Sequence, residues 1–408
     1  MCDISKKQTK PKYEVQDILN LYGDEYIKNH KLTAVQKKAI TDIRSCRTSK
    51  LGYNVRECCN CSNIEFSYNS CRNRNCPKCQ GEKRYKWIED RLKTTIDTPY
   101  YHVVFTVPNQ LFDIAIYNQK IFYNLLFKSA SDTLKLFGKD SKYWDMKEIT
   151  NKESKIDLAF FGILHTWGST LVFHPHIHFI VAGAGISKDT ILKPKYNSKF
   201  LFPVKAMSRV FRGKLVEGIK KAYYKNELDL DDRFKDSGYF ESFIDHVVKR
   251  KWIVYSKAPF KSSKKVVSYM SRYTHKSAIS NGRIVSIDNN SVRFRYKDYK
   301  NSNKIKTMKL SSDEFIKRFL YHILPKRYFR VRYYGLVQKL SKIKNNKIIT
   351  LDTKEIQEQL NHKKQKCKKC KSTKSEVVLV VDANKKVLQG VITPQILKLK
   401  EDVFHDSS

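Results

Sequence analysis

The sequence predicts an α+β protein in which a sheet covered by helices follows a small, helical, cysteine-rich domain. Across the middle of the chain, β-rich runs alternate with helix-like stretches, which is the pattern of a sheet with helices packed on it. Six of the ten cysteines lie in one short segment ahead of that region. The 408 residues, 41% of them apolar, suffice for two or three domains with a sizeable core.

The elements can be assigned in chain order. Apolar residues at helical spacing predict two helices within 14–50, and a charged stretch predicts a helix over 81–92. Thr98-Pro99 then breaks the pattern before a strand at 100–107, so a new domain is expected to begin near Pro99. Further helices are expected near 110–137, 203–226, 239–250, 262–274 and 312–323, and further strands near 157–165, 176–182, 252–256, 283–287, 291–297 and 305–310.

These assignments predict three consecutive regions: 1–98, 99–340 and a basic extension, 341–408. The extension is rich in Lys and Asn and is the part least suited to a compact core.

The net charge indicates the partner. The chain carries 80 Lys and Arg against 40 Asp and Glu, a formal charge of +40 at pH 7, which favours a polyanion and nucleic acid first of all. A membrane surface would also attract this charge. However, no apolar run approaches the roughly 18 residues of a spanning helix, and the N-terminus lacks a signal peptide. We therefore expect a cytoplasmic protein with no membrane partner.

The clustered cysteines predict a metal site, because cytosolic thiols stay reduced and are more often ligands than disulfides. Cys58-x2-Cys61 and Cys76-x2-Cys79 are separated by fourteen residues, a spacing typical of structural zinc. The alternative is that these cysteines simply pack in the core. Other cysteines have an open role: Cys46, Cys59, Cys71, Cys367 and Cys370. Arg72 and Arg74 beside the second pair are candidate DNA contacts, although a plain solvated surface would look the same.

A histidine pair predicts a second metal site. Side chains alternate along a strand, so His176 and His178 face the same way and form half a site. Two ordinary, partly buried histidines are the alternative. The third ligand is left open among His165, His102 and His275.

Two tyrosines four residues apart, Tyr269 and Tyr273, lie on one face of an expected helix and could act as nucleophiles. Core packing is the alternative, since the chain has 24 tyrosines. A phenol with a pKa of about 10 is a weak nucleophile at neutral pH, so it needs a polarised phosphate. Arg272 and Lys276 could hold neighbouring phosphates. The product would be a 5′-phosphotyrosine and a free 3′-hydroxyl, formed without ATP, and no phosphate-binding P-loop motif occurs.

Several segments resemble the two-tyrosine HUH rolling-circle transposases of insertion sequences, the IS91-like family. The residues that carry the resemblance are Tyr68 to Gln80, Pro99 to Pro108, His174 to His178 and Tyr269 to His275, with further matches between Arg293 and Gly335. The resemblance covers roughly 30–340. One departure is Asn54, where many relatives place a histidine; this puts an additional zinc ligand in doubt.

The resemblance implies an HUH-type antiparallel sheet, with His176 and His178 as ligands of a catalytic Mg²⁺ or Mn²⁺ and with Tyr269 and Tyr273 as nucleophiles. It also implies structural zinc on the N-terminal cysteines. The activity would be that of a transposase, cutting and rejoining single-stranded DNA at transposon ends and in target DNA. Because imidazole ligands favour Mn²⁺ or Zn²⁺ over Mg²⁺, we expect Mn²⁺ to be at least as effective as Mg²⁺.

Two other functions fit parts of the pattern. A plasmid replication initiator or relaxase could use the same chemistry on a plasmid origin, and a non-catalytic zinc-dependent DNA-binding protein would need only the charge and the cysteines. The zinc domain and the absence of a helicase motif favour transposition over the first. Covalent attachment to DNA would exclude the second.

Overall fold

The computed structural model describes residues 11–79, 98–147, 156–187, 190–195, 200–260, 277–299, 301–335, 367–372 and 374–391. The chain forms two compact units. Unit 1 comprises Met1–Tyr85, His275–Lys317 and Asp352–Ser408, and unit 2 comprises Lys86–Thr274 and Arg318–Leu351. This division differs from the three consecutive regions predicted, because unit 1 also draws in two segments that lie far along the chain.

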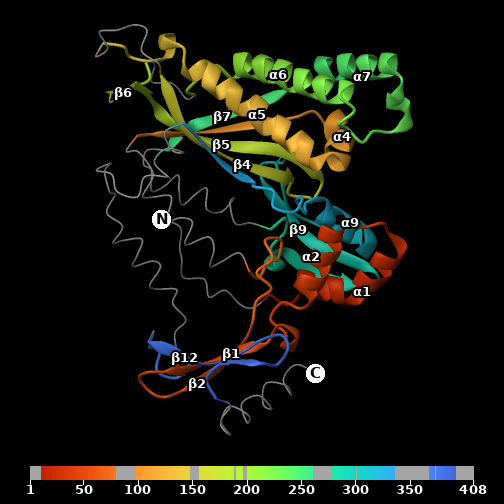
Figure 1. Ribbon diagram of the computed structural model, residues 1–408, viewed down its shortest axis with the longest axis vertical. Helices are drawn as coiled ribbons and strands as arrows, with labels where there is room; N and C mark the ends of the chain where they lie inside the picture. The colour runs from red at the N-terminus through yellow and green to blue at the C-terminus, as the bar shows by residue number, and fades with distance from the viewer. Residues whose placement is uncertain are drawn as a thin grey trace. The chain divides into compact units, whose positions relative to one another are not determined.

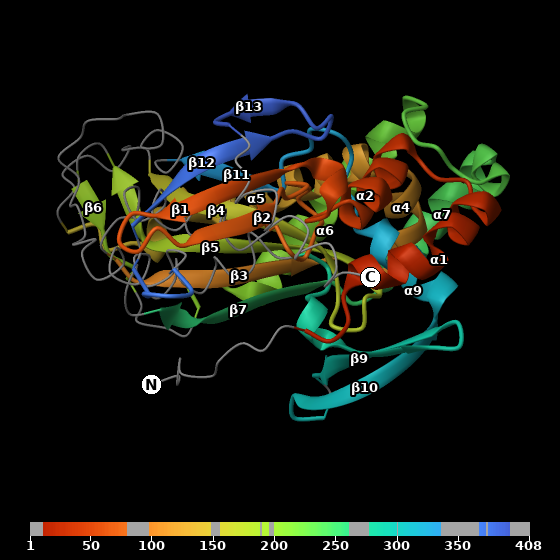
Figure 2. The ribbon, with the colours of Figure 1, turned by 90° about the horizontal axis from the view of Figure 1, so that it is seen from below.

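Unit 2 is built on one antiparallel sheet with the strand order β11-β4-β5-β3-β7, and β6 pairs with β5 at its end (Figure 2). Its strands are β3 (Tyr100–Thr106), β4 (Asp157–Trp167), β5 (Phe173–Ser187), β6 (Thr190–Leu192), β7 (Ile253–Phe260) and β11 (Val331–Gly335). The mixed α+β class with an antiparallel sheet is therefore confirmed.

Helices cover one face of this sheet (Figure 1). They are α4 (Phe112–Tyr117), α5 (Gln119–Gly138), α6 (Val204–Tyr224) and α7 (Ser237–Lys249). Phe105, Ile177 and Phe179 point from the strands into the core, where they join Phe122 of α5 and Phe211 of α6. Because strand side chains alternate, the residues between them in sequence face away from these helices.

One helix was predicted over 110–137, but the structure has two, with Asn118 at the junction of α4 and α5. The Asn118 side chain donates to the Asp229 carbonyl at 2.8 Å and accepts from the Asp229 N–H at 2.7 Å. Asparagine readily bonds to the backbone in this way, and the paired bonds account for the break.

In the described residues of unit 1 there are two α-helices, two small sheets and the start of a third α-helix. Its elements are α1 (Val15–Asn29), α2 (Ala34–Arg44), β1 (Tyr53–Cys58), β2 (Ile64–Tyr68), β8 (Ile284–Asp288), β9 (Ser291–Asp298), β10 (Lys304–Ser311), α9 (Ser312–Tyr321, which crosses the boundary between the units), β12 (Ser375–Val381) and β13 (Val387–Gln389). The strand orders are β13-β12-β1-β2 and β10-β9-β8. A reciprocal capping box between Thr33 and Gln36 starts α2.

The C-terminal residues contribute a strand to unit 1, contrary to their description as a basic extension. β12 pairs antiparallel with β1, and Leu379 and Val381 are buried against Tyr53 and Val55. Gly52 precedes β1 with φ 75°, and a Cβ there would lie 2.2 Å from the Val381 carbonyl oxygen. Only glycine allows this close approach of the two chain segments.

The helices expected over 81–92 and 262–274 lie outside the described residues. Within the described part of the chain, no helix combines the length and the apolar character needed to span a membrane.

Candidate functional site

Three histidines converge on the sheet face of unit 2 that points away from the helices. The register of β4 and β5 places His165 opposite His176, while His178 lies two residues further along the same face. One ring nitrogen from each of the three side chains lies within 4.8 Å of the others. The predicted pair is thus brought together, and His165 is the third member among the candidates left open.

Hydrogen bonds orient the ligand nitrogens. His176 Nδ1 lies 2.6 Å from the backbone carbonyl oxygen of His174, which can only accept, so Nδ1 carries the proton and the Nε2 lone pair remains available. His178 Nδ1 lies 2.8 Å from His102 Nε2. His102, another candidate third ligand, is therefore a hydrogen-bond partner of the candidate ligand His178, and such contacts orient metal-binding histidines.

The environment keeps these imidazoles neutral. Burial lowers the pKa of His176 to about 3 and, together with nearby Lys257, lowers that of His102 to about 4. Burial also holds the pKa of His178 well below its usual value, and His165 adds to this effect. A neutral imidazole is the form that binds a metal.

The three side chains fit a divalent ion. Three imidazoles are a common donor set, and they leave further coordination positions for substrate oxygen or water. His176 is half-buried, whereas His165 and His178 are buried. The three histidines therefore lie on two paired strands, and part of the His176 side chain is exposed.

The remaining catalytic candidates lie outside the described residues: Tyr269, Arg272, Tyr273, His275 and Lys276.

Eight of the nine cysteines described in unit 1 form two clusters of four. The first is Cys46, Cys71, Cys76 and Cys79, and the second is Cys58, Cys61, Cys367 and Cys370. The predicted set of Cys58, Cys61, Cys76 and Cys79 is thus divided between two clusters. Cys58 and Cys61 lie with Cys367 and Cys370, whereas Cys76 and Cys79 lie with Cys46 and Cys71.

The β1–β2 hairpin explains the division. Cys58 and Cys61 lie at the turn of the hairpin, whereas the chain reaches Cys71 only after β2 has returned to the other end, where Tyr68 pairs with Tyr53. At about 3.3 Å per residue, the six-residue strand β1 separates the two ends by roughly 17 Å. The hairpin was not predicted, although apolar and polar residues alternate in both strands between Tyr53 and Tyr68 and this alternation indicates strands.

The first cluster is anchored to α1. The Gln16 side chain donates to the Cys46 carbonyl at 3.1 Å, and Lys78 forms an ion pair with Glu14. Of the two predicted DNA contacts, Arg72 is exposed, whereas burial lowers the pKa of Arg74. Arg72 is therefore the better placed to meet a phosphate.

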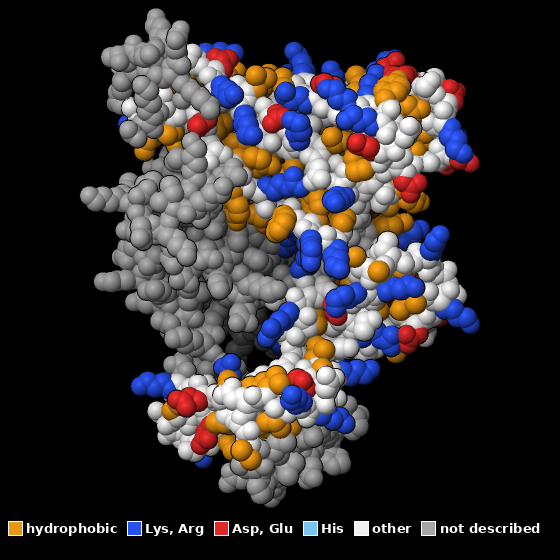
Figure 3. Space-filling model, viewed as in Figure 1, with side chains coloured by type: hydrophobic (Ala, Val, Ile, Leu, Met, Phe, Trp, Pro, Cys, Tyr) orange, Lys and Arg blue, Asp and Glu red, His pale blue; other side chains and the backbone are white. Residues whose placement is uncertain are grey.

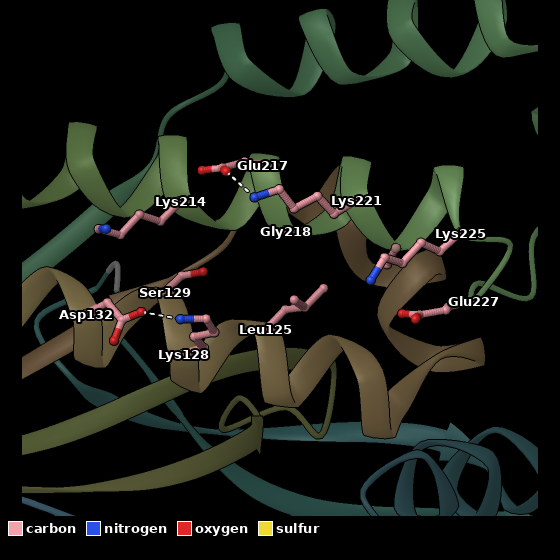
Figure 4. A pocket seen from close by; sticks show the side chains of 11 residues that line it. Leu125, Lys128, Ser129, Asp132, Lys214, Glu217, Gly218, Lys221, Lys225 and Glu227 are labelled. Carbon is pink, nitrogen blue, oxygen red and sulfur yellow. Dashed lines mark hydrogen bonds and ion pairs between the residues drawn. The ribbon is translucent and has the colours of Figure 1, made fainter.

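A groove of about 320 Å³ lies between α5 and α6 (Figure 4). The ion pairs Lys128–Asp132 and Lys221–Glu217 lie along it, and its lining carries four lysines against three acidic side chains. The groove belongs to the helical layer, on the opposite side of the sheet from the histidines, so it is not part of the histidine site.

Basic side chains are more abundant than acidic ones on one face of the molecule. On the face shown in Figure 3, Lys and Arg side chains are spread widely and Asp and Glu side chains are fewer. This agrees with the overall excess of 80 basic over 40 acidic residues. Such a surface attracts nucleic acid through long-range electrostatics.

Comparison with known proteins identifies the family. A family model described as "Transposase zinc-binding domain" matches residues 18–107, and one described as "Putative transposase" matches residues 159–347. The chain is 38% identical to "Putative transposase y4qJ" of Sinorhizobium fredii over 79% of its length and 80% of that protein. It is 25% identical to "Transposase for insertion sequence element IS801" of Pseudomonas savastanoi pv. phaseolicola, over 81% and 78%.

No solved structure matches the chain. Both family models and both relatives agree with the resemblance seen in the sequence motifs, and the relatives cover the zinc-binding and transposase regions together. The chain therefore belongs to the IS91-like family of insertion-sequence transposases and carries the zinc-binding domain of that family.

Proposed function

We propose that this transposase cuts and rejoins single-stranded DNA at the ends of its element by transesterification, with Tyr269 and Tyr273 as the nucleophiles. The observation that supports this most strongly is the convergence of His165, His176 and His178 on one face of the sheet. Two phenols at helical spacing in a very basic protein supply the other half of the chemistry.

In the proposed reaction the tyrosine oxygen attacks phosphorus and the bond to the 3′ oxygen breaks. The products are a 5′-phosphotyrosine and a 3′-hydroxyl, with the phenolic proton ending on the 3′ oxygen. A divalent ion held by the three imidazoles would neutralise charge on the attacked phosphate. The hydrogen bonds of His176 and His178 hold both rings in place for this task. Rejoining reverses the step, which conserves bond energy.

Covalent capture tests the nucleophiles. We expect labelled single-stranded DNA from the element's ends, incubated with Mn²⁺ and protein, to give a protease-sensitive adduct on a denaturing gel. The double variant Tyr269→Phe/Tyr273→Phe should give none, because no phenol remains to form the bond. The single variants then assign a role to each tyrosine. Tyr117→Phe is the matched control, because Tyr117 is 72% exposed on α4, and it should keep full activity.

If the wild-type protein binds this DNA well but forms no adduct on either strand, with Mn²⁺ or with Mg²⁺, the nuclease mechanism is wrong and only DNA binding remains. The same gel compares the two ions, and we expect Mn²⁺ to be at least as effective as Mg²⁺, since the ligands are imidazoles.

DNA affinity should fall steeply with salt, because each phosphate neutralised by Lys or Arg releases counterions. A protein that contacts about six phosphates of a single strand loses about three hundredfold in affinity between about 50 and 200 mM salt. Fluorescence anisotropy with a labelled single strand measures this slope. An affinity that does not change with salt would mean that the +40 charge is not used for binding.

A further inference from the structure

The second cysteine cluster joins two parts of the chain that lie about three hundred residues apart. Cys58 and Cys61 come from the turn after β1, and Cys367 and Cys370 precede β12. We propose that the chain binds two zinc ions, and that one of them is held by these four cysteines as a clasp between the β1–β2 hairpin and the C-terminal strand.

The sulfur separations fit this assignment. Cys58 Sγ lies 3.5 Å from Cys370 Sγ, and Cys61 Sγ lies 3.7 Å from Cys367 Sγ. Zn–S bonds of about 2.3 Å in a tetrahedron place sulfurs about 3.8 Å apart. A disulfide would require about 2.0 Å, and all four thiols are free. In the first cluster the corresponding separations are 3.5 and 3.6 Å, so both clusters have the same dimensions.

The two turns of the second cluster have the same backbone structure. In each, the N–H of the first cysteine donates to the carbonyl five residues on, and the N–H four residues on donates back to the carbonyl of that cysteine. The donor and acceptor pairs are Cys58 to Asn63 (2.9 Å), Ser62 to Cys58 (2.9 Å), Cys367 to Ser372 (2.8 Å) and Lys371 to Cys367 (3.0 Å).

Each turn also places a residue in the left-handed region at the same position, Ser62 with φ 50° and Lys371 with φ 63°. Non-glycine residues adopt this conformation at a cost, which makes its repetition informative. Two copies of one turn, each directing two thiols to a common point, form a symmetric four-sulfur site.

The fold itself brings the turns together. β1 and β12 pair antiparallel up to Cys58 opposite Ser375, and the Cys59 N–H donates to the Lys374 carbonyl at 3.2 Å. The Lys368 N–H donates to the Glu65 carboxylate at 2.7 Å, which links the C-terminal turn to β2. Four thiolates leave no open position, so the zinc would be structural rather than catalytic.

Zinc content tests the proposal on the full-length protein. Native mass spectrometry and elemental analysis should give one zinc ion fewer per chain for Cys367→Ser/Cys370→Ser than for the wild type, whatever metal the three-histidine site holds. Cys59→Ser is the matched control: Cys59 is exposed in the same turn as Cys58 and Cys61 but belongs to neither cluster, so this variant should keep the wild-type count. Fewer than two zinc ions in the wild type, or equal zinc counts in the wild type and the double variant, would overturn the proposal.

A spectroscopic measurement on the wild type avoids any variant that fails to fold. The protein loaded with ¹¹³Cd should give two cadmium resonances at the shifts of four-sulfur coordination, in addition to any resonance from the three-histidine site; fewer than two four-sulfur resonances would contradict the proposal. Metal count and cadmium shift do not depend on DNA cleavage. The proposed nuclease mechanism and the zinc clasp can therefore fail separately.

Discussion

The His178→Ala variant is expected to form the covalent DNA adduct about a thousandfold more slowly than the wild type while binding single-stranded DNA with similar affinity. His178 is buried between His165 and His176 in the ligand cluster, and its ring is oriented by His102. Loss of one of three ligands removes charge stabilisation at the phosphate of several kcal/mol, and each 1.4 kcal/mol corresponds to about tenfold in rate. Single-turnover adduct formation in Mn²⁺ measures the effect.

His174→Ala is the control for this prediction. His174 lies on the same strand and its ring packs near that of His176, with centroids 5.1 Å apart, but its hydrogen bond to His176 comes from the backbone carbonyl, which the substitution keeps. We expect a loss of less than about tenfold. His102→Ala should fall between the two, at about 10- to 100-fold, as is usual for a group that orients a ligand. Equal activity of His178→Ala and wild type would exclude the histidine cluster from catalysis.

The sequence was sufficient to predict that His176 and His178 lie together, but it did not identify the third histidine of the cluster. Strand alternation alone places His176 and His178 on one face. The third member of the cluster depends on the register of β4 against β5, which pairs His165 with His176 and has an irregularity next to it. Register is set by the packing of the whole sheet, so the sequence left three candidates equal. The roles of Tyr269 and Tyr273 stay predictions.

The cysteine clusters were also predicted only in part from the sequence. The CxxC spacing correctly predicts that each pair acts as one unit, because a tight turn is a local property. Which pairs share a site is a long-range property: it depends on the β1–β2 hairpin and on β12, neither of which was predicted. The basic composition of the C-terminal residues suggested an extension outside any core. Two apolar residues of β12, Leu379 and Val381, are nevertheless buried against β1.

The largest effect on stability is expected for Phe179→Ala, at about 3–5 kcal/mol. Phe179 follows His178 in β5 and points to the opposite face of the sheet, where it is fully buried. Its ring lies edge-on to Phe105, with centroids 5.7 Å apart, and it also fills the space over Gly162, where an added Cβ would lie 2.5 Å from Phe179 Cε1. Removing the ring leaves a cavity that the sheet cannot close.

Urea unfolding followed by tryptophan fluorescence measures this change in unit 2 alone, because all four tryptophans lie within Lys86–Thr274. Phe329→Ala is the matched control: Phe329 is 77% exposed in the same unit, so its loss should change the free energy of unfolding by no more than about 0.5 kcal/mol. Similar unfolding midpoints for the two variants would mean that Phe179 does not support the sheet. A large loss of stability in Phe179→Ala would show that Phe179 holds β5 in place from the helical face of the sheet. His178, the preceding residue of β5, would then be fixed in position on the opposite face by the packing of its neighbour.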